Sequence, residues 1–235
     1  MNKKEFTGIL EHISPDLLIN KDNQDKYQSF FLILGMIYND LKGLIFFQKI
    51  IEDNYRLPDK DEVTVHMGEY SGLMTQANKF LISVVAEFLL FTEKNKDVVN
   101  SIPFRVLLKK VDNKTRVDWI NIIDPEQDVT SIISKIARIR SNVSFHYDHS
   151  AEELRRGFVR SFFKESKGLV QHKKAYFSFG DTMEFTRFYY SDAAVDEYVR
   201  SLITGEDMAN IRKFIGNMNQ SIQAMLLVYI RSIKK

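Results

Sequence analysis

The fold and the candidate site of this chain meet in residues 129–149, which read VTSIISKIARIRSNVSFHYDH. Apolar residues, Ile136 and Ile139 among them, recur there at the three- and four-residue spacing of an amphipathic helix. One face of this helix must therefore be buried against other elements. At about 100° per residue, Arg140 falls about 60° to one side of the apolar stripe and His146 about 60° to the other. Both side chains are thus expected to flank the contact face.

The composition is that of a soluble globular protein, with 44% hydrophobic and 27% charged residues. A chain of 235 residues can bury a sizeable core, and we expect one domain. No uninterrupted apolar run is as long as a membrane-spanning helix, and the first residues lack the apolar core of a secretory signal. There are no cysteines for disulfides or thiolate metal sites. These features predict a cytoplasmic protein that does not cross a membrane.

The net charge is only +2, but the charges are distributed unevenly. Residues 52–97 carry nine acidic and five basic side chains, whereas residues 134–175 carry ten basic and four acidic ones. Such a local positive excess favours an anionic partner such as RNA, although the solvated faces of long helices also produce it. Arg138, Arg155 and Arg156 are the candidate RNA-binding residues.

Helical periodicity dominates the rest of the chain. Apolar stripes predict long helices over residues 27–55 and 64–95, and a last helix follows Gly205 with the cleanest stripe of all. We therefore predict a mainly α-helical bundle of six or seven helices. Its expected parts are an N-terminal arm (1–26), a bundle that carries the motif (27–166), an insertion (175–190) and C-terminal helices (192–235).

The insertion differs from its surroundings because aromatic residues crowd it. Gly180 and Asp181 suit a two-residue turn, so the segment is either a small β-hairpin or a loop with a helical turn. Packing in the core is the expected role of the aromatic residues in 176–190, with a substrate platform and a dimer arm as alternatives. The residues just before it, 151–167, are expected to be helical.

Glu87 lies within the most apolar segment of the second long helix. A buried carboxylate is costly unless it has a partner, so we expect Glu87 to pair with a basic residue of the core. His146 and His149 are three residues apart, but the other histidines show no ligand spacing, and no phosphate-binding glycine motif occurs. No metal site and no cofactor are therefore predicted.

Arg140, five further residues, then His146 and Tyr147 form the most informative motif of the chain. The motif resembles the signature of the HEPN-domain family, an all-α family in which an Arg and a His, four to six residues apart, lie near the end of a helix. Members often carry a polar residue, commonly Asn, directly after the Arg, whereas this chain has Ser141 there and Asn142 one place later. The close likeness is confined to residues 140–148.

This resemblance implies a metal-independent endoribonuclease whose active site is shared across a homodimer, each chain giving one Arg and one His. His146 has the right ordinary pKa to take a proton from a ribose 2′-OH and to return one to the leaving 5′-oxygen. Arg140 is suited to hold the phosphate as its charge shifts. The family also supplies bacteria with toxins and phage-defence effectors, which implies an antitoxin or a defence-system protein as a further partner.

Four neighbouring residues are expected to support this pair. Asn142 lies four residues before His146, so it would orient the imidazole or the phosphate if the helix continues. Ser141 is the other candidate polar support, and Tyr147 and His149 are expected at the mouth of the site.

Two further interpretations remain open. The first is a non-catalytic HEPN-like module that binds a nucleotide, a nucleic acid or a protein partner through the same residues. The second is a structural or interaction protein that dimerises through the apolar faces of residues 27–55 and 129–143.

Overall fold

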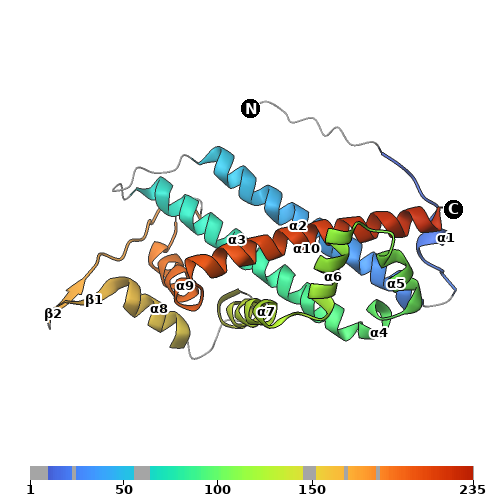
Figure 1. Cartoon of the computed structure of the whole chain (residues 1–235). Helices are drawn as coiled ribbons and strands as arrows, with labels where there is room; N and C mark the ends of the chain where they lie inside the picture. The colour runs from blue at the N-terminus through green and yellow to red at the C-terminus, as the bar shows by residue number, and fades with distance from the viewer. Residues whose placement is uncertain are drawn as a thin grey trace.

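Three long helices, α2, α3 and α10, form the framework of the fold, as the computed structural model shows (Figure 1). The structure describes residues 10–22, 25–55, 64–144, 152–166, 169–183 and 186–234. Helices α4 to α6 gather at one end of the framework, and α8, α9 and a two-stranded sheet lie at the other (Figure 1). The elements of the described residues are α1 (Pro15–Leu18), α2 (Lys26–Asn54), α3 (Val65–Lys94), α4 (Lys96–Val99), α5 (Ile102–Leu108), α6 (Asn113–Ile123), α7 (Gln127–Ile139), the π-helical turn η1 (Arg140–Ser144), α8 (Glu152–Phe162), β1 (Phe163–Ser166), β2 (Leu169–His172), α9 (Tyr189–Leu202) and α10 (Gly205–Ile233).

The predicted mainly α-helical bundle is confirmed by this architecture. Side chains at the helix starts explain where the elements begin. Asp25, Thr64 and Ser101 each accept a hydrogen bond from a backbone N–H in the first turn of α2, α3 and α5. Thr204 and Asp207 form a reciprocal capping box at the start of α10. These caps satisfy backbone donors that the helices themselves leave without acceptors.

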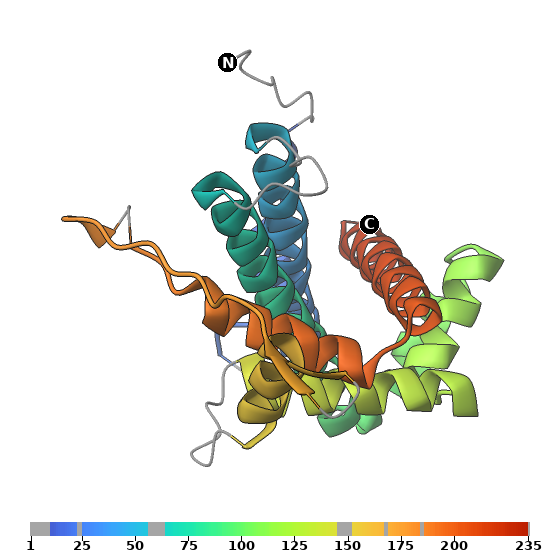
Figure 2. The same ribbon diagram turned by 90° about the vertical axis from the view of Figure 1, so that its left-hand side faces the viewer.

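The core is built along the apolar stripes. Helix α10 buries the predicted positions at helical spacing, and Phe30, Leu34, Ile37 and Leu41 of α2 are also buried. In Figure 2, α7, α8 and α9 lie together below α2 and α3, while α10 stands beside α6. The buried residues of the α10 stripe are Ile211, Ile215, Met218, Ile222, Met225 and Tyr229.

Two contacts fix the helix that carries the motif. Ile136 and Ile139 of α7 are completely buried, which sets the face that α7 turns towards the core. Lys135 Nζ lies 2.7 Å from Asp207 Oδ1, so α7 is also tied to the N-terminus of α10. This ion pair and the hydrogen bonds from Thr204 lower the pKa of Asp207 to about 2. The end of α7 is therefore held in a defined position.

The predicted helix over residues 151–167 is wrong in its last third. Helix α8 ends at Phe162, and β1 pairs antiparallel with β2 in the register Phe163↔His172. The backbone of Lys173 also donates to the carbonyl of Phe162, 2.8 Å away, which extends the pairing by one bond. The hydrogen bonds between β1 and β2 thus replace the i→i−4 hydrogen bonds that would have continued helix α8.

Most of the described aromatic side chains of the segment 176–190 lie outside the core, contrary to the expected role, and Tyr189 and Tyr190 are half-buried. Tyr176, Phe177, Phe179 and Phe188 are all exposed. Its described residues contain no strand, but Ser178 and Arg187 form an isolated antiparallel bridge, with N···O distances of 2.8 and 3.1 Å. Within the described residues, the predicted hairpin is therefore reduced to this bridge and one further backbone hydrogen bond, from Tyr190 N–H to the carbonyl of Tyr176, 3.1 Å away.

One face of α2 is apolar and exposed. The described residues leave the α2 side chains Leu32, Met36, Phe46, Phe47 and Ile50 exposed. By length and composition, α2 and α3 each contain a segment apolar enough to cross a membrane, with 28% and 33% of the two segments buried. Core helices of soluble proteins meet the same criterion, so a cytoplasmic protein that does not cross a membrane stays a prediction.

Candidate functional site

Arg140 lies at the junction of α7 and η1, where α7 packs against α3. Its Nη2 donates a hydrogen bond to Glu87 Oε1 on α3, and the two side chains are 27% and 57% exposed. The sequence prediction that Glu87 pairs with a basic residue is confirmed, whereas the expected burial of its carboxylate is wrong. Because Glu87 faces solvent, a competing anion can approach this ion pair.

The guanidinium of Arg140 is only partly satisfied. Its Nε is buried and donates to no acceptor among the described residues. A buried N–H without an acceptor costs about 1–3 kcal/mol, so such a group marks a place where another acceptor would be stabilising. Within the described part of the chain, Arg140 thus combines a hydrogen bond to an exposed carboxylate with a buried donor, Nε, that has no acceptor.

A cavity of about 360 Å³ adjoins Arg140 between α3, α6 and α7. Its walls are mostly apolar, and its charged groups are Arg140, Glu93 and Lys96. Lys96 Nζ and Glu93 Oε1 are 3.9 Å apart, so Lys96 is not an isolated cation. The lining residues are Ala86, Leu89, Leu90, Thr92, Glu93, Lys96, Ile122, Ile123, Pro125, Ile133, Ile136, Ala137 and Arg140.

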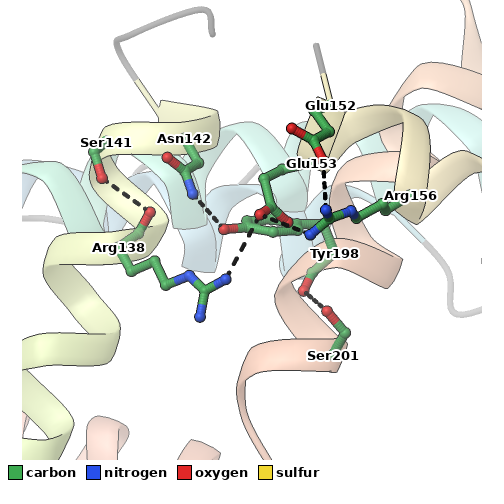
Figure 3. A network of polar contacts seen from close by, with 8 residues as sticks. All are labelled: Arg138, Ser141, Asn142, Glu152, Glu153, Arg156, Tyr198 and Ser201. Carbon is green, nitrogen blue, oxygen red and sulfur yellow. Dashed lines mark hydrogen bonds and ion pairs between the residues drawn. The ribbon is translucent and has the colours of Figure 1, made fainter. Parts of the chain in front are cut away.

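Asn142 is directed towards α9 rather than towards Arg140. Its Nδ2 donates to the hydroxyl of Tyr198, 2.6 Å away, and Tyr198 is almost completely buried (Figure 3). Ser141 turns back on its own helix, where its Oγ donates to the carbonyl oxygens of Ala137 and Arg138 at 3.0 and 3.2 Å. Both residues therefore support the shape of the turn after Arg140 through contacts within the chain.

Two of the three predicted RNA-binding arginines are engaged in ion pairs. Arg138 Nη2 lies 3.6 Å from Glu153 Oε1, and Arg156 contacts both Glu152 and Glu153 (Figure 3). The Arg138–Glu153 pair connects the end of α7 to the start of α8, whereas the pairs of Arg156 lie within α8. Arg155 is exposed and forms no ion pair within the part of the chain that the structure describes.

The motif continues beyond the described residues. His146, Tyr147 and His149 fall within 145–151 and therefore outside them. From Arg140 to Ser144 the chain is π-helical, with i→i+5 hydrogen bonds in a wider turn. The prediction that placed His146 about 60° from the apolar stripe assumed an α-helix with about 100° per residue. This assumption does not hold after Arg140. Such π-helical turns are frequent at functional sites.

Sequence reasoning missed two features of this region. Tyr198 gave no signal, because nothing in α9 indicates that its hydroxyl would meet Asn142. The Arg138–Glu153 ion pair was missed because it depends on how α7 and α8 pack, whereas the i,i+3 and i,i+4 spacing of Glu153 and Glu152 from Arg156 could have indicated the other two pairs. Among the described residues, no three histidine or acidic side chains are grouped as metal ligands. Comparisons with family models, with curated proteins and with solved structures find no match to this chain.

Proposed function

We propose that this protein is a metal-independent endoribonuclease of the HEPN type. The observation that carries the proposal is the incomplete hydrogen bonding of the Arg140 guanidinium at the start of the motif. Its Nη2 is held by the exposed carboxylate of Glu87, and its buried Nε has no acceptor among the described residues. A phosphate oxygen would replace the first contact and supply the second, and guanidinium–phosphate hydrogen bonds are among the strongest in proteins.

The proposed reaction follows from the chemistry of the two motif residues. His146 removes the proton from a ribose 2′-OH, and the 2′-oxygen forms a bond to the adjacent phosphorus. The bond from phosphorus to the 5′-oxygen breaks, and an imidazolium returns a proton to that oxygen. Arg140 stabilises the extra negative charge on the phosphate oxygens during the exchange. The products are a 2′,3′-cyclic phosphate and a 5′-hydroxyl end.

A homodimer is part of this proposal, since each site would combine residues of two copies. The exposed apolar side chains of α2, which form two groups around Leu32 and Met36 and around Phe46, Phe47 and Ile50, would support association if a second copy covers them. Sedimentation at micromolar concentration tests the requirement directly. A strictly monomeric protein would contradict a shared site.

The activity is tested by incubating the protein with total RNA in EDTA. We expect cleavage by the wild type, with 2′,3′-cyclic phosphate ends, and loss of cleavage in His146→Ala. His172→Ala is the matched control, because His172 is exposed on β2 and lies outside the motif. Equal cleavage by His146→Ala and the wild type, or no cleavage by the wild type, would contradict the proposed activity.

A second candidate function is a non-catalytic module that binds a nucleotide, a nucleic acid or a protein through the same residues. It is favoured by the use of Asn142, Arg138 and Arg156 in contacts within the chain, which leaves fewer groups for substrate. In that case Arg140→Ala abolishes binding of RNA or of an antitoxin or defence-system protein, while RNA remains intact in every assay.

A further inference from the structure

A second and larger cavity lies at the opposite end of α3. It has a volume of about 600 Å³ and is lined by the first half of α3, by one face of α9 from Tyr189 to Arg200, and by residues 176–177. Met74 in its wall and Glu87 are separated by roughly 20 Å along α3, from a rise of 1.5 Å per residue. The cavity is thus distinct from the Arg140 site. Its lining residues are Thr64, Val65, Met67, Gly68, Tyr70, Ser71, Met74, Thr75, Asn78, Tyr176, Phe177, Tyr189, Asp192, Ala193, Asp196 and Arg200.

Aromatic side chains form much of the wall of this cavity. They are Tyr70 from α3, Tyr176 and Phe177 from the stretch between β2 and α9, and Tyr189 from the first turn of α9. Tyr176 is 45% and Phe177 62% exposed, so these two rings remain open to solvent beside the cavity. Accessible aromatic faces beside a cavity can stack against a planar ring of a ligand. For nucleic-acid bases, each such stacking contact contributes about 1–3 kcal/mol to the binding free energy.

The Tyr189 side chain, which forms part of the cavity wall, is held in place by hydrogen bonds and by packing against α3. Its hydroxyl lies 2.9 Å from Ser178 Oγ and 3.3 Å from Glu69 Oε1. The ring lies so close to α3 that a Cβ at Gly68 would be 2.4 Å from it. Glycine is therefore required for the ring to lie against the helix backbone, and the cavity has at least one preformed aromatic surface.

The neighbouring Arg187 fastens the same segment. Its Nε lies 2.9 Å from Asp192 Oδ2 and its Nη1 lies 3.4 Å from Glu69 Oε2. A Cβ at Gly72, one turn after Gly68, would fall 2.1 Å from this guanidinium. Two glycines one turn apart thus admit both anchoring side chains onto α3.

The polar part of the lining favours an uncharged ligand with N–H donors. Asp196 Oδ2 is paired with Arg200 Nε at 2.8 Å, and no described residue donates a hydrogen bond to Asp196 Oδ1. Asp192 is likewise paired with Arg187, so the cavity has no excess positive charge to attract a phosphate group. A carboxylate beside stacked aromatic rings instead suits a planar ring that presents adjacent N–H groups.

We propose that this cavity binds a guanine base. The base would stack on Tyr176 and Phe177, and its adjacent ring N–H and amino group would donate to the carboxylate of Asp196. Guanine presents these two donors in parallel along one edge, so that one would reach the free Oδ1 of Asp196 and the other the remaining lone pair of Oδ2, beside Arg200. The base comes either from a free guanine nucleoside or from a single strand of RNA, and both sources share this chemistry.

The experiment measures binding to the full-length protein by equilibrium dialysis, with guanosine, inosine and uridine as probes. We expect saturable binding of guanosine, weaker binding of inosine, which lacks the amino group, and the weakest binding of uridine. Phe177→Ala should weaken guanosine binding roughly 5- to 150-fold. Phe179→Ala is the matched control, because Phe179 is 83% exposed in the same segment and does not line the cavity. Circular dichroism checks that both variants are folded.

A guanine-containing hexaribonucleotide distinguishes the two sources. Tighter binding of the oligonucleotide than of guanosine, lost in Phe177→Ala, assigns the base to an RNA strand, whereas binding of guanosine alone assigns it to a free nucleoside. Arg140→Ala should leave guanosine binding unchanged, so failure at one site is distinguishable from failure at the other. The proposal is overturned if no guanine ligand binds saturably at millimolar concentration, or if Phe177→Ala and Phe179→Ala behave alike.

Discussion

Helix α3 presents a glutamate to an arginine at both of its ends, and the two ion pairs are built differently. At the N-terminal end, Glu69 and Arg187 are 24% and 22% exposed, and Asp192 also contacts Arg187. At the other end, Glu87 is 57% exposed and, among the described residues, is the one ion-pair partner of Arg140, whose Nε lacks an acceptor there. A closed network of several contacts indicates a structural role, whereas an open, incomplete pair is suited to exchange its partner for a ligand.

The largest expected effect comes from breaking the open pair. Arg140→Ala should lower RNA cleavage by roughly 10²- to 10³-fold, because a donor to the phosphate oxygens is lost. Its free energy of unfolding should change by less than about 1 kcal/mol, since ion pairs with an exposed partner contribute little. Cleavage assays and urea unfolding of the same preparation measure both. A stable variant with unchanged cleavage would contradict the role assigned to Arg140.

Breaking the closed pair should have the opposite pattern. Arg187→Ala leaves Glu69 and Asp192 without their cationic partner in a partly buried place, and we expect a loss of about 2–3 kcal/mol in the free energy of unfolding. RNA cleavage should remain near the wild-type rate. Arg200→Ala is the control, because Arg200 is 71% exposed and its pair with Asp196 should be worth less than about 1 kcal/mol. Equal effects of Arg187→Ala and Arg200→Ala on urea unfolding would contradict a structural role for the Arg187 network.

The close approach on α3 can be tested without changing any charge. Gly68→Ala places a methyl group against the Tyr189 ring and should lower the free energy of unfolding by about 1–3 kcal/mol through overpacking. Gly43→Ala on α2 is the matched control. A Cβ at Gly43 meets no atom within 4 Å, so this substitution should stabilise the helix by up to about 1 kcal/mol. Thermal melts of the two variants should therefore shift in opposite directions.

The smallest expected effect concerns the support of α7. The pKa of Asp207 is lowered to about 2 by Lys135 and Thr204, so its ionised form is favoured in the folded state. The resulting stabilisation is present above the ordinary pKa of 3.8 and is lost as the pH falls from there to about 2. The difference in melting temperature between the wild type and Asp207→Asn should shrink across this window. A difference that stays constant with pH would show that Asp207 does not act through its charge.

The sequence predicted the parts of the fold that depend on local periodicity. The stripes of α2 and α10 were identified because residues three and four apart share a face whatever the neighbouring element is. The hairpin after Phe162 was not, since its polar and charged residues suit a helix as well as a strand and the pairing itself decides between them. The exposed aromatic segment was assigned to the core for a similar reason, because aromatic residues are usually buried.

For the candidate site too, some features could be predicted from the local sequence and others depend on tertiary packing. The spacing of Arg140 and His146 can be read from the chain, and a partner for Glu87 could be expected from its apolar surroundings. That the partner is Arg140, 53 positions away, depends on how α7 packs against α3. The π-helical turn at Arg140 and the glycines beneath Tyr189 also arise from tertiary contacts, which no spacing rule contains.

Mixing two inactive variants tests the central claim most directly. If the active site combines an arginine from one copy with a histidine from the other, Arg140→Ala and His146→Ala should each fail to cleave RNA in EDTA. After subunit exchange, their mixture should recover cleavage, because the mixed dimer retains one intact Arg140 and one intact His146 on opposite copies. A mixture that stays inactive although mixed dimers have formed would contradict a site shared between two copies of this chain.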